Sequence, residues 1–203
     1  MSVTAPAAPF APEPVAAERP ADQIDNRPTY ISFGLAYVLG HGTAALSQGA
    51  TPLLDLPGRL STALLGAGLA VGTVLATVTA LRAQRAATDP ADVLSGKLLG
   101  AAWITAFAAL FLAVTGLTDS LDAPALQSML WPTGSGLMVG LLYVAEGVQR
   151  RNLLHYGLGT WLALTSTGAL LLGTPGFYWV LTVAGGGAYA LAAVLERRRL
   201  TSR

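Results

Sequence analysis

Apolar residues gather in six long stretches of the chain that contain almost no ionised side chain. Each stretch is close to the roughly 20 residues that an α-helix needs to cross the hydrocarbon core of a bilayer. The apolar residues run continuously, whereas strands of a membrane barrel alternate over about 10 residues. The pattern predicts an all-α, polytopic membrane protein with six transmembrane helices and short loops. The predicted spans are Tyr30–Ala50, Leu60–Leu81, Leu98–Leu117, Met129–Val148, Leu153–Leu172 and Phe177–Leu195.

The residues before the first span have a different character. Prolines recur through residues 1–28 among Ala, Glu and Asp, and such a segment cannot bury enough apolar surface to fold. It also lacks the basic start and immediate apolar run of a signal peptide. We therefore expect a disordered cytoplasmic tail over residues 1–28, a transmembrane domain over 29–196 and a basic cytoplasmic C-terminus over 197–203.

The amino-acid composition does not fit a soluble protein. The 203 residues are 53% hydrophobic and only 11% charged, with a mean hydropathy of +0.54, whereas soluble domains carry about 25% charged residues. The chain has no cysteine, which excludes a disulfide framework. A net charge of +1 gives no indication of a nucleic-acid partner. The lipid bilayer is the partner that this composition predicts.

The basic residues predict the orientation of the spans. Of the 12 Lys and Arg residues, all but Arg59 lie in the tail, in the second and fourth loops or at the C-terminus. Lys and Arg near span ends are retained on the cytoplasmic side. Both termini are therefore predicted to be cytoplasmic.

Small residues four positions apart predict how the spans pack, because helices in lipid associate where their backbones approach closely. The second span has such a stripe, and the fourth has a shorter one. These stripes could pack spans of one chain against each other or pack copies of the chain in a homo-oligomer, and the spacing does not decide between these alternatives. The predicted packing residues are Gly68, Gly72, Ala76, Gly136 and Gly140.

Two connections carry their own signals. Asp89 followed by Pro90 is typical of an N-cap and first helical position, so the third helix should begin before it enters the membrane. The connection 149–152 is short enough to make the fourth and fifth spans an antiparallel hairpin. Aromatic residues near the span ends are interpreted as interfacial anchors. They are Tyr30, Phe33, Trp131, Tyr156, Phe177, Tyr178 and Trp179.

His41 is a polar residue near the predicted bilayer centre. It stands between two glycines about 11 residues into the first span, roughly 16 Å deep at about 1.5 Å per residue. A neutral imidazole there can hydrogen-bond to another helix, or it can belong to a solute or proton path. Gln48 lies two turns further along and could line the same path or bond at the outer rim.

Glu146 is the one carboxylate inside a predicted span, near the cytoplasmic end of the fourth helix. Arg150 is four residues further on, which favours an ion pair, and His155 begins the fifth helix at a similar depth. The sequence predicts a Glu146, Arg150 and His155 cluster at the cytoplasmic mouth, a second candidate part of a solute or proton path. It lies more than about 10 Å from the depth of His41, so the two are not paired.

Several activities are excluded by missing motifs. There is no G-x-x-x-x-G-K-[ST], no H-E-x-x-H and no G-x-S-x-G. The chain has no cysteine, and its two histidines lie at different depths. We therefore predict that the protein binds no metal and no cofactor and that it is not an enzyme.

The motif Trp131-Pro132-Thr133-Gly134-Ser135-Gly136 and the stretch Ala184-Gly185-Gly186-Gly187-Ala188 resemble small, uncharacterised six-helix inner-membrane proteins of high-GC bacteria. Such proteins are sometimes labelled permeases of ATP-binding-cassette transporters. The resemblance implies a bacterial cytoplasmic membrane protein of transport-related, permease-like function, powered by a separate ATPase where transport is active. The alternative is a non-transporting scaffold or accessory protein that binds other membrane helices.

Overall fold

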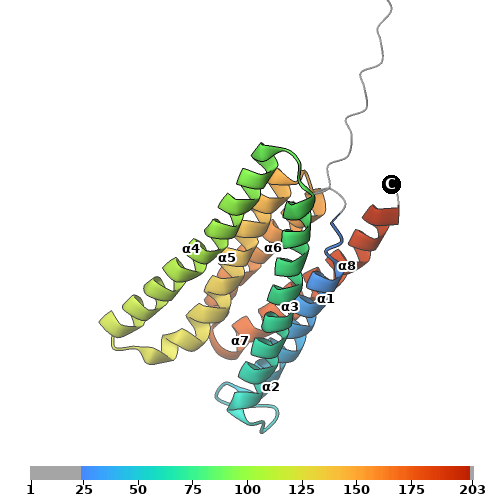
Figure 1. The fold of residues 1–203 in the computed structure, drawn as a ribbon. Helices are drawn as coiled ribbons and strands as arrows, with labels where there is room; N and C mark the ends of the chain where they lie inside the picture. Colours follow the sequence, from blue (N-terminus) through green and yellow to red (C-terminus); the bar gives the residue numbers. More distant parts are fainter. Residues whose placement is uncertain (1–23, 202–203) are drawn as a thin grey trace, which may run out of the picture.

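The computed structural model describes residues 24–201, and each element in this range is helical (Figure 1). Three helices, α3, α4 and α5, are long, while the first and last parts of the chain consist of shorter segments. The elements are α1 Arg27–Ala36, the π-helical η2 Tyr37–His41, α2 Gly42–Ser47, α3 Gly58–Ala86, α4 Pro90–Ser120, the 3₁₀ turn η3 Pro124–Leu126, α5 Gln127–Gln149, α6 Leu153–Ala169, the 3₁₀ turn η4 Leu170–Leu172, α7 Gly173–Val180, the π-helical η5 Leu181–Gly185 and α8 Gly186–Thr201.

Four helical segments are long and apolar enough to cross a membrane, namely Gly58–Ala86, Pro90–Ser120, Pro124–Gln149 and Leu153–Thr201. These apolar helices indicate a membrane protein. The last segment consists of two arms, because Gly173 has a φ of 60° and Thr174 is non-helical. The run from Arg27 to Ser47 is also helical but is not among the four. Six crossings and cytoplasmic termini therefore stay predictions.

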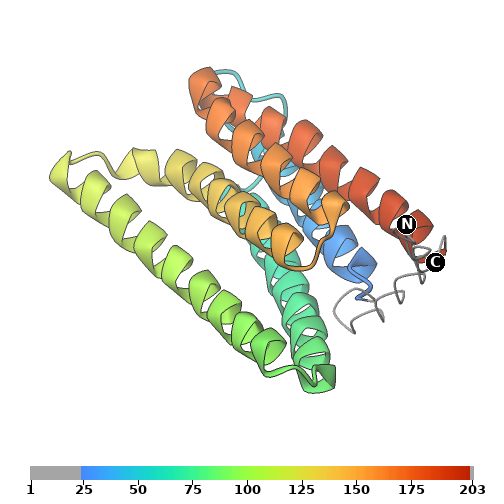
Figure 2. The ribbon, with the colours of Figure 1, turned by 90° about the horizontal axis from the view of Figure 1, so that it is seen from above.

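Helix α4 begins outside the predicted third span, as the sequence indicated. The Asp89 side chain accepts a hydrogen bond from the backbone N–H of Ala91 at 2.9 Å, and Pro90 is the first helical residue. The predicted N-cap is therefore confirmed. From this start α4 diverges from α3, and the two helices are close only near their connection (Figure 2).

Helices α5 and α6 form an antiparallel pair whose contact is made by glycines. A Cβ atom built on Gly140 would lie 2.5 Å from the Ala163 nitrogen, and one built on Gly159 would lie 2.5 Å from the Gly140 oxygen. Gly136 packs against Ser166 in the same seam. Because backbone faces backbone at these positions, the two helices approach closely.

Helix α1 lies between α3 and α8, side by side with each (Figures 1 and 2). Gly68 of α3 faces Ala36, and Gly72 faces the Phe33 ring. Ala76, the next residue of the predicted stripe, is half-buried. The small-residue face of α3 therefore packs within this chain.

The start of α1 differs from the predicted boundary of the tail. Residues 1–23 lie outside the described residues, but residues 24–28 belong to the folded part. The Ile24 carbonyl accepts a hydrogen bond from Arg199 at 2.7 Å, Asn26 is the N-cap of α1, and Pro28 occupies its first turn. Contacts with α8, which are distant in sequence, order these residues.

Three aromatic residues interpreted as interfacial anchors are core residues instead. Tyr30 and Phe177 are 0% exposed and Tyr178 is 6% exposed. The interpretation was wrong for these three, because neighbouring helices cover the faces on which they lie. Tyr156 and Trp179 are 42% and 38% exposed, as an anchor requires.

Candidate functional site

A buried carboxylate, Glu146 on α5, is the centre of a polar site between four helices. Its Oε1 accepts a hydrogen bond from the indole N–H of Trp103 on α4 at 2.9 Å. Its Oε2 lies 3.1 Å from Nε2 of His155 on α6. The Arg150 guanidinium lies 3.6 Å from Oε2, one helical turn along α5. The carboxylate thus has hydrogen-bond partners on both oxygens and a cation beside it.

His155 continues this arrangement to a third helix. Its Nδ1 lies 2.6 Å from the hydroxyl of Tyr30 on α1, and the imidazole is 4% exposed. With the hydrogen on Nε2, His155 donates to Glu146 and accepts from the Tyr30 hydroxyl through Nδ1. Tyr30, His155 and Glu146 form one chain of hydrogen bonds, which we call the relay.

The connection between α5 and α6 holds the relay in place. Arg151 adopts a left-handed conformation with a φ of 49°, which reverses the chain in a few residues. Asn152 then caps α6, its Oδ1 accepting from the His155 backbone N–H at 3.1 Å. Gly147 lets the Tyr156 backbone approach α5. A turn and a close contact therefore bring His155 opposite Glu146.

A column of aromatic rings leads from the relay into the bundle. The ring centroids of His155 and Tyr143 are 4.1 Å apart, those of Tyr143 and Tyr189 are 6.4 Å apart, and those of Tyr189 and Tyr37 are 5.4 Å apart. The Tyr37 ring meets His41 edge-on at 4.9 Å. Each of these residues is buried.

The far end of the column is formed around the first π-helical segment. His41 ends η2, and its ring centroid lies 6.1 Å from that of Tyr178 on α7. The Tyr178 hydroxyl donates to the Ser128 carbonyl at 3.2 Å, and the Gln48 side chain approaches the same hydroxyl. The π-helical η5 packs against η2 where Gly185 faces the Tyr37 ring. Such π-helical insertions are frequent at functional sites.

Ser166 lies beside the column with its polar atom unsatisfied. Its side chain is 0% exposed, and its Oγ has no hydrogen-bond partner among the described residues. A Cβ atom built on Gly136 would touch Ser166 and would lie 3.3 Å from the Tyr37 hydroxyl. Glycine at position 136 therefore lets the Ser166 side chain pack directly against the α5 backbone, next to the Tyr37 hydroxyl.

The structure brings Glu146, Arg150 and His155 together and keeps His41 and Gln48 in a separate group. Sequence reasoning did not include Tyr30 and Trp103 in the site, although both contact it directly. It also did not identify the tyrosines that connect the two groups. Their signal was present but ambiguous, because a tyrosine in an apolar span fits a lipid-facing rim equally well.

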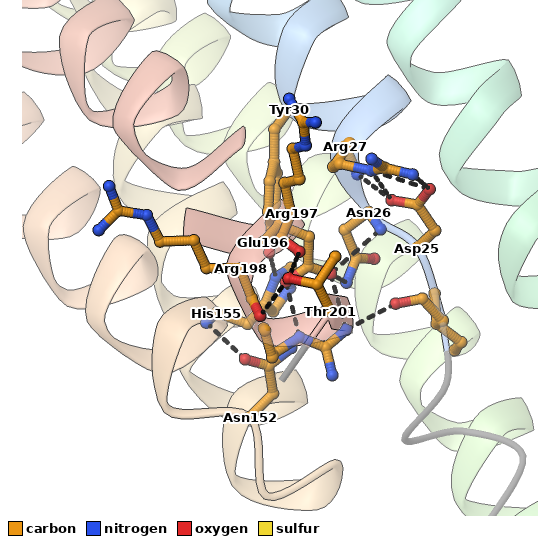
Figure 3. A network of polar contacts seen from close by, with 12 residues as sticks. Asp25, Asn26, Arg27, Tyr30, Asn152, His155, Glu196, Arg197, Arg198 and Thr201 are labelled. Atoms are coloured by element: carbon orange, nitrogen blue, oxygen red, sulfur yellow. Dashed lines mark hydrogen bonds and ion pairs between the residues drawn. The ribbon is translucent and has the colours of Figure 1, made fainter. Parts of the chain in front are cut away.

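A second buried carboxylate, Glu196 on α8, was missed altogether. It is 0% exposed and accepts hydrogen bonds from the backbone N–H and side-chain amide of Asn26, at 3.2 and 3.0 Å (Figure 3). Arg199 donates to it through Nε at 2.7 Å and Nη2 at 2.8 Å. The pair joins the start of α1 to the end of α8. The hydrogen bonds from Asn26 to Glu196 hold these two helix ends together.

The described residues contain no group of three or more His, Cys, Asp or Glu side chains able to hold a metal ion. Comparisons of the chain with models of protein families, with curated proteins and with solved structures find no match.

Proposed function

We propose that this protein is a transport-related, permease-like subunit of the bacterial cytoplasmic membrane in which the relay moves protons. The observation that carries the proposal is the buried Tyr30, His155 and Glu146 chain, with hydrogen-bond distances of 2.6 and 3.1 Å. Ionisable groups are costly inside a membrane protein, and buried chains of Glu and His are typical of proton pathways.

The chemistry of imidazole suits this role. A proton that arrives at Nδ1 of His155 converts the ring to an imidazolium, and release of the Nε2 hydrogen to Glu146 restores a neutral ring. The Tyr30 hydroxyl can deliver the first proton and be reprotonated from its other side. Tyr143 and Tyr189 interact through their hydroxyl groups, and the path would continue from the relay toward His41 through the hydroxyl groups of the column rather than through its ring contacts.

The arrangement of the ends of the bundle supports the predicted topology. Asn26 and Glu196 are in contact, so the start of α1 and the end of α8 lie at the same end. The α3–α4 and α5–α6 connections lie toward that end as well, and the α4–α5 connection lies at the opposite end (Figure 1). Six crossings with cytoplasmic termini would give this arrangement.

Proton flux into proteoliposomes tests the proposal. A potassium diffusion potential would drive protons inward, and a trapped pH-sensitive dye would report them. We expect flux above that of empty liposomes, and its loss in Tyr30→Phe and Glu146→Gln. Tyr156→Phe is the matched control, because Tyr156 is 42% exposed and lies outside the relay. Flux equal to that of empty liposomes, or unchanged flux in both relay variants, would refute the proton path.

One observation favours the alternative of a scaffold that binds other membrane helices. The most apolar windows of α3 and α4 are only 6% and 11% buried. Partner helices could cover these faces. Purification from native membranes separates the alternatives, since an associated ATPase favours transport and a membrane partner bound to α3 or α4 without flux favours the scaffold.

A further inference from the structure

A groove of about 380 Å³ opens at the same end of the bundle as the relay, outside the hydrogen-bond chain itself. It lies between the α5–α6 connection and the last turns of α8. Its polar lining comes from Arg150, Arg151, Asn152 and Arg199, and its apolar lining includes Leu153 and Leu195. We propose that this groove binds the phosphate-bearing headgroup of an anionic phospholipid.

The charge of the groove favours an anion. Arg150 lies 3.6 Å from Glu146, and Arg199 is paired with Glu196 at 2.7 Å, so a carboxylate neutralises two of the three guanidinium groups of the groove. The third, Arg151, is exposed and leaves the groove a net positive charge. Guanidinium groups recognise phosphate through paired N–H donors. The first turn of α6 adds the partial positive charge of a helix N-terminus.

The apolar rim distinguishes a lipid from a soluble phosphate. Leu153 is 85% exposed beside the arginines, and Leu195 lies across the groove from it. A phosphodiester held by the arginines would direct its acyl chains along these leucines. Basic pockets between membrane helices on the cytoplasmic side bind anionic headgroups in this manner.

Native mass spectrometry of the full chain in a neutral detergent tests the proposal. The probes are a short-chain phosphatidylglycerol, the matching phosphatidylcholine and inorganic phosphate. We expect phosphatidylglycerol to bind more tightly than phosphatidylcholine. Arg151→Gln should weaken its binding about fivefold, the value of one basic residue near an anionic surface, and Arg151→Glu should weaken it further.

Arg82→Gln is the matched control, since Arg82 is exposed on α3 and does not line the groove. Equal binding of the two lipids, or an equal loss in Arg82→Gln, would overturn the proposal. Displacement by inorganic phosphate without any preference between the lipids would assign the groove to a soluble phosphate and overturn the lipid assignment. Arg151 is not part of the relay, so these outcomes are independent of proton flux.

Discussion

Replacing Gly140 with alanine tests the seam between α5 and α6. The added methyl group would lie 2.5 Å from the Ala163 nitrogen, 2.7 Å from the Gly159 oxygen and 2.9 Å from the Ala163 Cα. All three atoms belong to the backbone of α6, so no side chain can rotate away. The helices would have to separate over the whole seam.

The size of the effect follows from two opposing terms. Overpacking of a tight contact costs about 1 to 3 kcal/mol, while alanine in place of glycine in a helix gains about 0.5 to 1 kcal/mol. Gly157→Ala is the matched control, because nothing lies within 4 Å of a Cβ atom at that position of α6. We expect the control to be neutral or stabilising and Gly140→Ala to be less stable than the control by about 2 kcal/mol.

Thermal unfolding in one detergent, followed by circular dichroism, measures this difference. For a chain of about 200 residues, 1 kcal/mol corresponds to about 2 to 4 °C, so the midpoints should differ by about 4 to 8 °C. Equal midpoints for the two variants would refute the close approach of α5 and α6 at Gly140.

Three further predictions concern stability and use the same thermal assay. Glu196→Ala removes the carboxylate to which the Arg199 guanidinium and the Asn26 amide donate, and it should cost about 3 kcal/mol, with a smaller loss in Glu196→Gln; equal stability of Glu196→Ala and wild type would contradict the junction. Asn152→Ala removes the N-cap of α6 and should cost about 1 kcal/mol, whereas Asn152→Asp should retain the cap. Identical unfolding midpoints for Asn152→Ala and Asn152→Asp would argue against capping by Asn152. Gly72→Leu should separate α3 from α1, and a variant as stable as the wild type would show that this face is not a contact.

The helices were largely predictable from the sequence because they depend on local properties of the chain. Long apolar stretches predict membrane helices whatever their neighbours are, and Asp89 caps α4 through an atom two residues away. The hairpin of α5 and α6 follows from a connection too short for any other path. Each of these features is determined within a few residues.

The sequence pattern did not predict which face of each helix is covered by other helices. Tyr30 and Tyr156 both stand near predicted cytoplasmic ends, yet Tyr30 is 0% and Tyr156 42% exposed. The difference arises because α6 and α8 cover Tyr30. Glu196 precedes three arginines and fits a solvated end, but its partner Asn26 is 170 residues away. A contact between residues so far apart in the sequence cannot be predicted from the local pattern around either residue.

The glycine contacts and the relay are two consequences of one arrangement. Glu146 and His155 hydrogen-bond at the end of the seam where the glycines bring the backbones of α5 and α6 together. Gly147 provides this approach one residue beyond Glu146, where a Cβ atom would meet the Tyr156 nitrogen at 2.5 Å. The carboxylate and imidazole alone would not have been enough to predict the 3.1 Å contact. The small residues beside them set the distance, so the chemistry of this site depends on the positions with no side chain.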